Sequence, residues 1–358
     1  MYYEKPAKTR ILNALKGNDT RHIPFTIYAL FMEKCTFERE LREQGMCYVQ
    51  HSRSYSIVQK ECSVKEIHYL DKNGEKVVRT EYHTPFKTLF LEQIPRPELF
   101  TSITRKHIFK DADDYKALLW LVNDMKAIPQ YEKTQSLVNY LGDDFAVRDQ
   151  IPLEPLQQMI TTTYMDIMTF SIEWYDNRDE ILKIYSAFRE LNRSIYSIVA
   201  EGPLEFVNYG GNVIPAIIGK QNFVKYYIDN YNEAAEIVHK RGKLIGTHLD
   251  DNNTIIMEEI GNTDLDYIEA YDPAISPPLD IAFKAFKNKA IWINWPSPWH
   301  YVSEDKIIGL TQELISQKSK NDRLLIGVTE NMPIGRERLL LSQILKGIQS
   351  AGIEDRYI

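Results

Sequence analysis

The sequence contains little cysteine: three residues in 358, all in the first fifth of the chain. Cys35, Cys47 and Cys62 are odd in number and show no C-x-x-C spacing, which excludes a framework of paired disulfides and a zinc site made of thiolates. Such sparse cysteine is typical of proteins from a reducing compartment. We therefore expect a cytoplasmic protein.

An excess of basic residues and a long apolar run are also missing. The chain has 43 Lys and Arg against 50 Asp and Glu, so its formal net charge is −7. It offers no basic field to nucleic acid. The longest uncharged stretch, 206–219, includes Gly210, Gly211 and Pro215 and is too short to span a bilayer. Residues 1–17 carry scattered charges and predict an amphipathic helix, not a signal peptide. Neither nucleic acid nor a membrane is an expected partner.

What is present is the composition of a folded protein, 44% hydrophobic and 26% charged, with a length that suits two domains or one large α/β barrel. Residues 24–28 predict a buried strand. The stretch 55–93 alternates and turns at Asn73-Gly74, a dipeptide that favours hairpins. With a helix predicted from Asp111 to about Pro129, it forms an N-terminal insertion over 55–134.

From about residue 135 onward, short apolar runs alternate with long amphipathic segments, a pattern that builds parallel sheets. The strands are predicted at 145–148, 204–208, 244–247, 267–268, 290–293 and 324–328, and the helices at 178–200, 221–241, 254–260, 278–286, 303–317 and 336–349. An open doubly wound sheet is the alternative, but no glycine-rich phosphate turn follows the first strand. We predict a (β/α)₈ TIM barrel with an N-terminal antiparallel hairpin insertion.

In such a barrel, functional groups collect where strands end. Polar side chains follow almost every predicted strand here: Asp149, Tyr209, Asn212, His248, Asp250, Glu269, Asn294, Glu330 and Asn331. His248-x-Asp250 could turn both side chains toward one cation, joined by Glu330 from a distant loop. Alternatively, Asp250 or Asp251 caps the helix beginning near Thr254.

Glu269 directly follows an apolar strand, where a carboxylate is costly unless it is partnered, so it is a candidate catalytic group or one half of a structural salt bridge. Trp292, Trp295 and Trp299 could wall a pocket for a flat ligand, although loop packing is the commoner role of such rings. No G-x-S-x-G elbow supports a serine nucleophile.

These positions resemble the uroporphyrinogen decarboxylase superfamily, in its branch of corrinoid-dependent methyltransferases and O-demethylases. The likeness rests on four stretches: R-I-L-N-A-L-K-G at 10–17 with R-H-I-P at 21–24, H-L-D at 248–250, D-Y-I-E-A at 266–270 with Pro277-Pro278, and I-G-V-T-E-N-M-P at 326–333. It covers most of the chain and implies a TIM barrel whose pocket opens at the carboxyl ends of the strands.

In relatives that methylate thiols, the resemblance implies a zinc ion held by an H-x-C pair and a later Cys. The first position is His248 here, but the cysteine positions are Asp250 and Glu330. An all-N/O ligand set is harder and suits the polarisation of an oxygen, as in ether cleavage, or else the metal has been lost. The arginine-rich segment with which the decarboxylase grips its substrate is not visible after Pro24, which disfavours porphyrin decarboxylation.

The resemblance thus implies a methyltransferase that takes a methyl group from a small donor, a methoxylated aromatic, and passes it to the corrinoid of a partner protein. The chain has no D-x-H-x-x-G corrinoid segment of its own. The predicted roles are metal ligands for zinc at His248, Asp250 and Glu330, catalytic groups at Glu269, Tyr209, Asn212 and Asn294, and substrate contacts at Trp295, Asn331 and Asp149. A homodimer is compatible with this hypothesis. The alternatives are a non-catalytic binding barrel and a metal-independent decarboxylase.

Overall fold

The computed structural model describes residues 5–19, 21–160 and 163–351 and divides the chain into two compact units. The first unit comprises 1–54, 131–151 and 199–358, and the second comprises 55–130 and 152–198. Each is described by itself.

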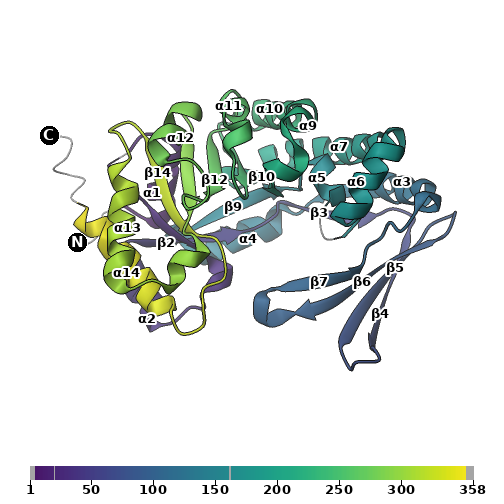
Figure 1. Ribbon diagram of the computed structural model, residues 1–358, viewed down its shortest axis with the longest axis horizontal. Coiled ribbons are helices and arrows are strands. Elements are labelled where there is room, and N and C mark those ends of the chain that lie inside the picture. Colours follow the sequence, from purple (N-terminus) through teal and green to yellow (C-terminus); the bar gives the residue numbers. More distant parts are fainter. Residues whose placement is uncertain (1–4, 20, 161–162, 352–358) are drawn as a thin grey trace. The chain divides into compact units, whose positions relative to one another are not determined.

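The first unit is a closed barrel of eight parallel strands in the order β1-β14-β13-β12-β11-β10-β9-β2 (Figure 1). Its strands are β1 Phe25–Tyr28, β2 Met46–His51, β9 Phe145–Ile151, β10 Phe206–Val213, β11 Leu244–Leu249, β12 Tyr267–Tyr271, β13 Ala290–Asn294 and β14 Arg323–Val328. The predicted (β/α)₈ barrel is confirmed. Strand β2 was not predicted, because Met46–His51 carries no period-2 alternation and is buried over its first four residues.

The helices of this unit follow barrel strands along the chain, except α1, which precedes β1, and α4, which precedes β9. They are α1 Ala7–Lys16, α2 Thr36–Glu43, α4 Tyr131–Leu141, α8 Pro215–Ile218, α9 Lys220–Tyr226, α10 Ile228–His239, α11 Met257–Gly261, α12 Leu279–Ala285, α13 Glu304–Ser316 and α14 Glu337–Ser350. The helix predicted at 221–241 is broken in two near Tyr227, and the other helices predicted for this unit lie close to their predicted ranges. The helix predicted from Asp111 to about Pro129 is wrong in its second half: it ends at Asn123, and Met125–Pro129 is a strand because it pairs with Tyr55–Gln59.

The second unit contains the predicted antiparallel hairpin as part of a four-stranded sheet, β4 Ser63–Leu70, β5 Lys76–His83, β6 Thr88–Arg96 and β7 Thr101–Lys106. Strands β3 Tyr55–Gln59 and β8 Met125–Pro129 form a separate pair, and the helices are α3 Tyr115–Asn123, α5 Pro155–Ile160, α6 Ile167–Asp176 and most of α7 Arg178–Glu201. At the predicted turn, Gly74 adopts φ 78° and its N–H donates to the carbonyl of Asp71. The hairpin insertion is confirmed.

Apolar side chains fill the amino-terminal half of the barrel interior. Helix α1 packs Ile11 and Leu15 against Phe206, which begins β10, and Leu325 near the start of β14, so it closes that end of the barrel. Above them, the Trp292 indole donates to Thr26 Oγ1 at 2.9 Å, and the Tyr267 hydroxyl donates to the carbonyl of Val207 at 2.6 Å. This half is a packed core, which leaves the carboxyl ends of the strands for chemistry.

Gly246 and Gly327 leave room inside the barrel for the Tyr267 and Trp292 rings, and Gly246 allows a prediction about stability. A Cβ at Gly246 would overlap the buried Tyr267 ring, whose hydroxyl is held by its hydrogen bond. We expect Gly246→Ala to destabilise the protein by about 1–3 kcal/mol through overpacking. Gly309→Ala is the control, because open space surrounds this position in α13 and alanine favours helix. Urea unfolding should show a lower midpoint for the first variant only; equal midpoints would contradict the packing argument.

Candidate active site

Charged side chains from three strands meet inside the carboxyl-terminal half of the barrel. The Arg148 guanidinium of β9 forms an ion pair with Glu269 of β12, and both side chains are almost completely buried, with 2% and 0% exposed. Glu269 Oε2 lies 3.1 Å from Nδ1 of His248, its register neighbour on β11. His248 Nε2 lies 3.0 Å from Asp250 Oδ1. The order Arg148, Glu269, His248, Asp250 therefore leads from the barrel interior to a carboxylate that is 38% exposed.

Two further side chains, from the ends of β1 and β2, complete this charged array. Arg148 Nη2 donates to His51 Nε2 at 2.9 Å and lies 3.5 Å from the Tyr28 hydroxyl. The Tyr28 and His51 rings meet edge to face with centroids 4.2 Å apart. Burial and the charge of Arg148 lower the pKa of His51 to about 3. The His51 imidazole is therefore neutral, and its Nε2 accepts a hydrogen bond from the Arg148 guanidinium. Neither residue was singled out in the sequence, since His51 ends a strand that was missed.

The electrostatics of the array separate the roles of its members. Burial alone would raise the pKa of Glu269, but Arg148 and His248 outweigh it and hold that pKa well below its usual range. Burial would lower the pKa of His248, yet hydrogen bonds to Asp250 and Glu269 raise it to about 9. Glu269 is thus a carboxylate and His248 an imidazolium at neutral pH, with 18% of the His248 side chain exposed. Both N–H groups of His248 face carboxylates, so the imidazolium can pass a proton to a ligand whose oxygen takes the place of Asp250 beside Nε2.

The backbone is strained around the same strand ends. Ala270 adopts φ 62° at a bulge directly after Glu269, and Asp251 adopts φ 59° directly after Asp250. Strand β10 bulges between Tyr209 and Val213, where Asn212 has φ 57°. Left-handed backbone at residues other than glycine costs free energy and concentrates at functional sites. The backbone strain is therefore a second observation, besides the buried charges, that marks the carboxyl ends of these strands as a candidate site.

Glu330 belongs to a different group of side chains. Asn294 Nδ2 donates to Glu330 Oε1 at 2.6 Å, the Ser297 hydroxyl donates to Glu330 Oε2, and the Thr329 N–H donates to Asn294 Oδ1 at 3.0 Å. Both carboxylate oxygens of Glu330 are therefore engaged by β13 and the loop after it. The predicted catalytic residue Asn294 positions Glu330 in this arrangement.

The three predicted zinc ligands do not converge on one point. His248 and Asp250 lie together, but both ring nitrogens of His248 face carboxylates and Glu330 bonds elsewhere. In the part of the chain that the structure describes, no three His, Cys, Asp or Glu side chains are grouped so that they could hold a metal ion. The donors as arranged do not fit a three-ligand zinc site, and zinc at these residues stays a prediction without geometric support.

Three other predicted residues lie outside the barrel interior or are inaccessible. Because successive strand residues point to opposite faces, Asp149 lies on the outer face of β9 when Arg148 points inward, and it accepts from the Ser54 N–H at 3.1 Å. Tyr209 also faces outward and packs edge to face on Tyr231 of α10, 5.3 Å between centroids. The structure does not support a catalytic Tyr209 or a substrate contact by Asp149.

Trp295 is fully buried and meets the Trp299 ring edge to face at 5.3 Å, which is loop packing rather than the predicted substrate contact. Asn212 and Asn331 are exposed, in the bulge of β10 and in the loop after β14. They remain candidates for ligand contact from the carboxyl ends of the strands.

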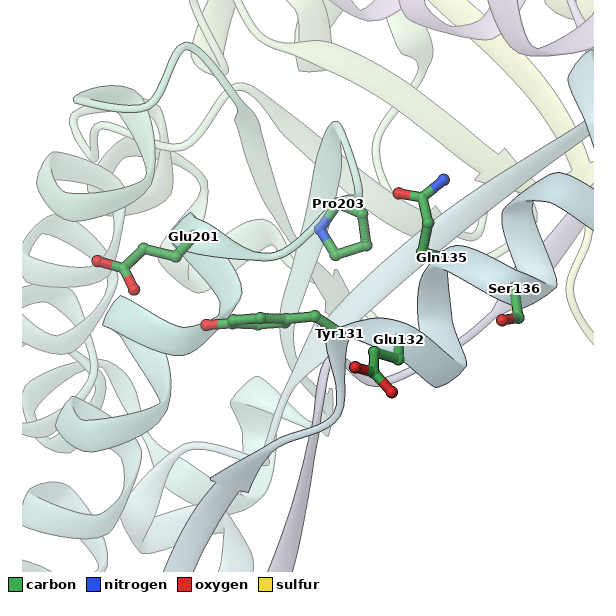
Figure 2. Close-up of a pocket in the computed structure, with 6 residues that line it drawn as sticks. All are labelled: Tyr131, Glu132, Gln135, Ser136, Glu201 and Pro203. Carbon is green, nitrogen blue, oxygen red and sulfur yellow. The ribbon is translucent and has the colours of Figure 1, made fainter.

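A cavity of about 490 Å³ on the barrel unit lies elsewhere, lined by Tyr131, Glu132, Gln135, Ser136, Glu201 and Pro203. Figure 2 shows the Tyr131 ring pointing toward Glu201, whose carboxylate also pairs with Arg241 at 3.3 Å. The cavity includes the connection from α7 to the amino end of β10, opposite to the end that carries the charged array. Barrel enzymes place their chemistry at the carboxyl ends, so we do not assign catalysis to this cavity.

Comparisons with known proteins identify the fold. No protein-family model and no curated protein matches the sequence. Among solved structures, a methyltransferase from Methanosarcina mazei is similar over 97% of this chain and 99% of its own, with a TM-score of 0.58 and 11% identity. At that identity the similarity establishes a shared fold.

Two further solved structures are similar with TM-scores below 0.5. A vitamin-B12-independent methionine synthase from Listeria monocytogenes has a TM-score of 0.39 and 13% identity over 62% of this chain and 68% of its own. The pneumococcal exo-β-D-N-acetylglucosaminidase StrH has a TM-score of 0.41 and 10% identity over 93% of this chain and 86% of its own.

Among the described residues, no helix is both long and apolar enough to cross a membrane.

Proposed function

We propose that this chain catalyses methyl transfer from a methoxylated aromatic donor to the reduced corrinoid of a separate protein, with His248 as the proton donor to the departing oxygen. The observation that carries the proposal is the position of His248 between Glu269 and Asp250 at the carboxyl end of β11. A proton donor at this position could serve several reactions. The full-length similarity to a methyltransferase supports the choice of methyl transfer.

Ether cleavage needs such a group because an aryl oxide leaves poorly without a proton. In the proposed step, the electron pair of the acceptor forms a bond to the methyl carbon while the carbon–oxygen bond breaks and its electrons stay on oxygen. His248 donates its proton to that oxygen, so the products are a phenol and the methylated acceptor. The partly exposed Asp250 then links the neutral imidazole to solvent for reprotonation.

Buried neighbours hold the donor in place. Glu269 fixes one imidazole nitrogen and stabilises the imidazolium, and Arg148 prevents Glu269 from taking up that proton by holding it ionised. Arg148 and Glu269 are positioning residues in this scheme. Asn212 and Asn331, at the ends of neighbouring loops, are proposed to contact the substrate.

The test is a transfer assay with free cob(I)alamin and with a reduced corrinoid protein as alternative acceptors. We expect phenol release matched by loss of the Co(I) absorbance when a methoxyarene is supplied. If neither acceptor is methylated by any methoxylated aromatic, the proposal fails. Release of CO₂ from aromatic carboxylates under the same conditions would instead favour the decarboxylase, for which the same proton donor would protonate a carbanion.

Metal content gives a separate prediction, because a proton from His248 replaces the Lewis acid expected from the sequence. We expect less than stoichiometric zinc in protein purified without a histidine tag, and unchanged phenol release after treatment with a chelator. One zinc per chain, lost in both His248→Ala and Glu330→Ala, would contradict the proton-donor mechanism and restore the zinc hypothesis. Elemental analysis of the three proteins decides between them.

A further inference from the structure

The four-stranded sheet of the second unit has an open edge at β4. In the part of the chain that the structure describes, β4 pairs only with β5, in one unbroken register over Ser63–Leu70. All residues of β4 except Ile67 are exposed, and none is proline or glycine. A long, regular and exposed edge strand is a template on which another strand can pair.

The opposite edge of the same sheet is protected. Strand β7 pairs with β6 through a register shift between Glu92 and Gln93, and it ends in the exposed residues Arg105 and Lys106. Irregular pairing and neighbouring like charges both disfavour the addition of a strand. The pairing of β4 with β5 has no such shift, so the β4 edge is the one that can accept a strand.

The hairpin turn shows which backbone groups of β4 face the open edge. The Asp71 N–H donates to the carbonyl of Glu75 at 3.0 Å, in continuation of the register between β4 and β5. Along an antiparallel strand the backbone groups of successive residues point to opposite sides. The odd-numbered residues of β4 therefore point theirs toward β5, and the even-numbered residues from 64 to 70 point theirs to the open edge.

The side chains of β4 are complementary to a second copy of the same strand. In an antiparallel pair centred on Ile67, Glu66 lies opposite His68 of the second copy, and Val64 lies opposite Leu70. Val64 is 49% and Leu70 65% exposed, so their contact would cover apolar surface. Both pairs join residues whose backbone groups face the open edge, so about eight hydrogen bonds can form between the copies.

Neighbouring registers fit less well. A two-fold axis normal to the sheet places one residue opposite its own copy, so each possible register has a residue at its centre. A centre at Lys65 or Glu66 puts like charges directly opposite each other, which is destabilising. A centre at His68 puts the Glu66 carboxylate opposite the apolar Leu70. The centre at Ile67 avoids both.

We propose that two copies of this protein associate through β4 about a two-fold axis at Ile67, which joins their two four-stranded sheets into one. This interface is separate from the charged array of the barrel and does not depend on the proposed reaction. It is self-complementary and uses up the open edge of each copy, so association stops at a dimer. One strand from each copy covers little area, so we expect a Kd in the micromolar range, on the order of a transient complex.

The first experiment reverses charges and is read by sedimentation velocity at up to about 200 µM protein. Glu66→Lys puts a lysine opposite His68 of the second copy, and His68→Glu puts two carboxylates opposite each other. Each variant alone should raise the dimer Kd by at least about 10-fold. An equimolar mixture should recover the dimer, because the introduced lysine then faces the introduced glutamate. Glu98→Lys, in the exposed turn before β7, makes the same charge change at the other edge and should dimerise as wild type does.

A second experiment tests the register by oxidative cross-linking. In the proposed dimer the two copies of residue 67 form a non-hydrogen-bonded pair with Cα atoms about 4.5 Å apart, within reach of a disulfide. Ile67→Cys should therefore give a covalent dimer. The Lys65→Cys control should not, since four residues, roughly 13 Å of strand, separate it from its copy. Both are made in a Cys35→Ser background, because Cys35 is exposed.

The remaining outcomes overturn the proposal. Wild type that stays monomeric at the highest concentration has no such interface. A dimer that persists in both Glu66→Lys and His68→Glu, or that is lost equally in Glu98→Lys, forms through another surface. Cross-linking of Lys65→Cys without that of Ile67→Cys would contradict the register. Species that grow beyond a dimer with concentration would contradict the closed two-fold pair.

Discussion

Replacing His248 with asparagine is expected to lower kcat for methyl transfer by about 10²- to 10⁴-fold, the usual contribution of a positioned proton donor. Asparagine can hydrogen-bond to Asp250 or Glu269 but has no proton to give to the leaving oxygen. Glu269 keeps its ion pair with Arg148 in this variant, so the fold should survive. The measurement is phenol release with free cob(I)alamin, which removes any effect on partner binding.

The pH profile provides the control. The protonated form of His248 is the active form, and its pKa is raised to about 9. We therefore expect kcat/KM to be flat near neutrality and to fall as the pH rises through about 9, where His248 loses its proton. Asp250→Asn removes a negative charge that raises this pKa and leaves at most a weaker, neutral acceptor beside Nε2, so the alkaline limb should move to lower pH. A limb that stays in place in Asp250→Asn would assign it to another group.

Replacing Arg148 with methionine is expected to lower the free energy of unfolding by up to about 3–5 kcal/mol, because it removes the larger of the two counter-charges of the buried Glu269 carboxylate and leaves only the His248 imidazolium. Glu269 has no exposed surface through which water could compensate. The double variant Arg148→Met/Glu269→Gln should recover part of the loss, since a neutral amide costs less to bury than a charge. Urea unfolding of the three proteins at pH 7 provides the measurement.

An exposed ion pair serves as the comparison for Arg148. Glu236 on α10 pairs at 2.7 Å with Lys240, the residue directly after this helix, and each side chain is 67% exposed. Lys240→Met should therefore leave the unfolding midpoint unchanged. If Arg148→Met also leaves the unfolding midpoint unchanged, the buried pair does not hold the carboxyl ends of the strands together. A double variant less stable than Arg148→Met would show that the pair is needed for more than charge balance.

Much of the barrel could be predicted because its periodicity is local. Runs such as 244–247 and 324–328 are apolar on both faces, as parallel strands between two layers must be, and amphipathic helices follow them. The same order predicted that His248 and Glu269 stand at strand ends, and the parallel register makes them neighbours. The strand Met46–His51 begins with an apolar run of only four residues between polar neighbours, too short to separate a strand from a buried helix segment, so His51 was not predicted to end a barrel strand.

The partnerships within the site could not be predicted in the same way. Arg148 lies 121 positions before Glu269, and as the last residue of the predicted strand 145–148 it carries no signal of this ion pair. Which of two consecutive residues points into the barrel depends on strand phase, and a shift of one residue exchanges the two faces. For this reason the sequence pattern favoured Asp149 where its neighbour Arg148 points into the barrel, and it favoured Tyr209, which faces outward.

The sequence by itself therefore determined the class of fold, the hairpin insertion and the polar character of the strand ends, because each depends on residues close together in the chain. Tertiary structure alone decided that both ring nitrogens of His248 face carboxylates. It also decided that Glu330 accepts a hydrogen bond from Asn294 and does not lie beside His248. Those choices depend on barrel closure and on bulges such as the one at Ala270, which turn side chains by amounts that no local pattern records.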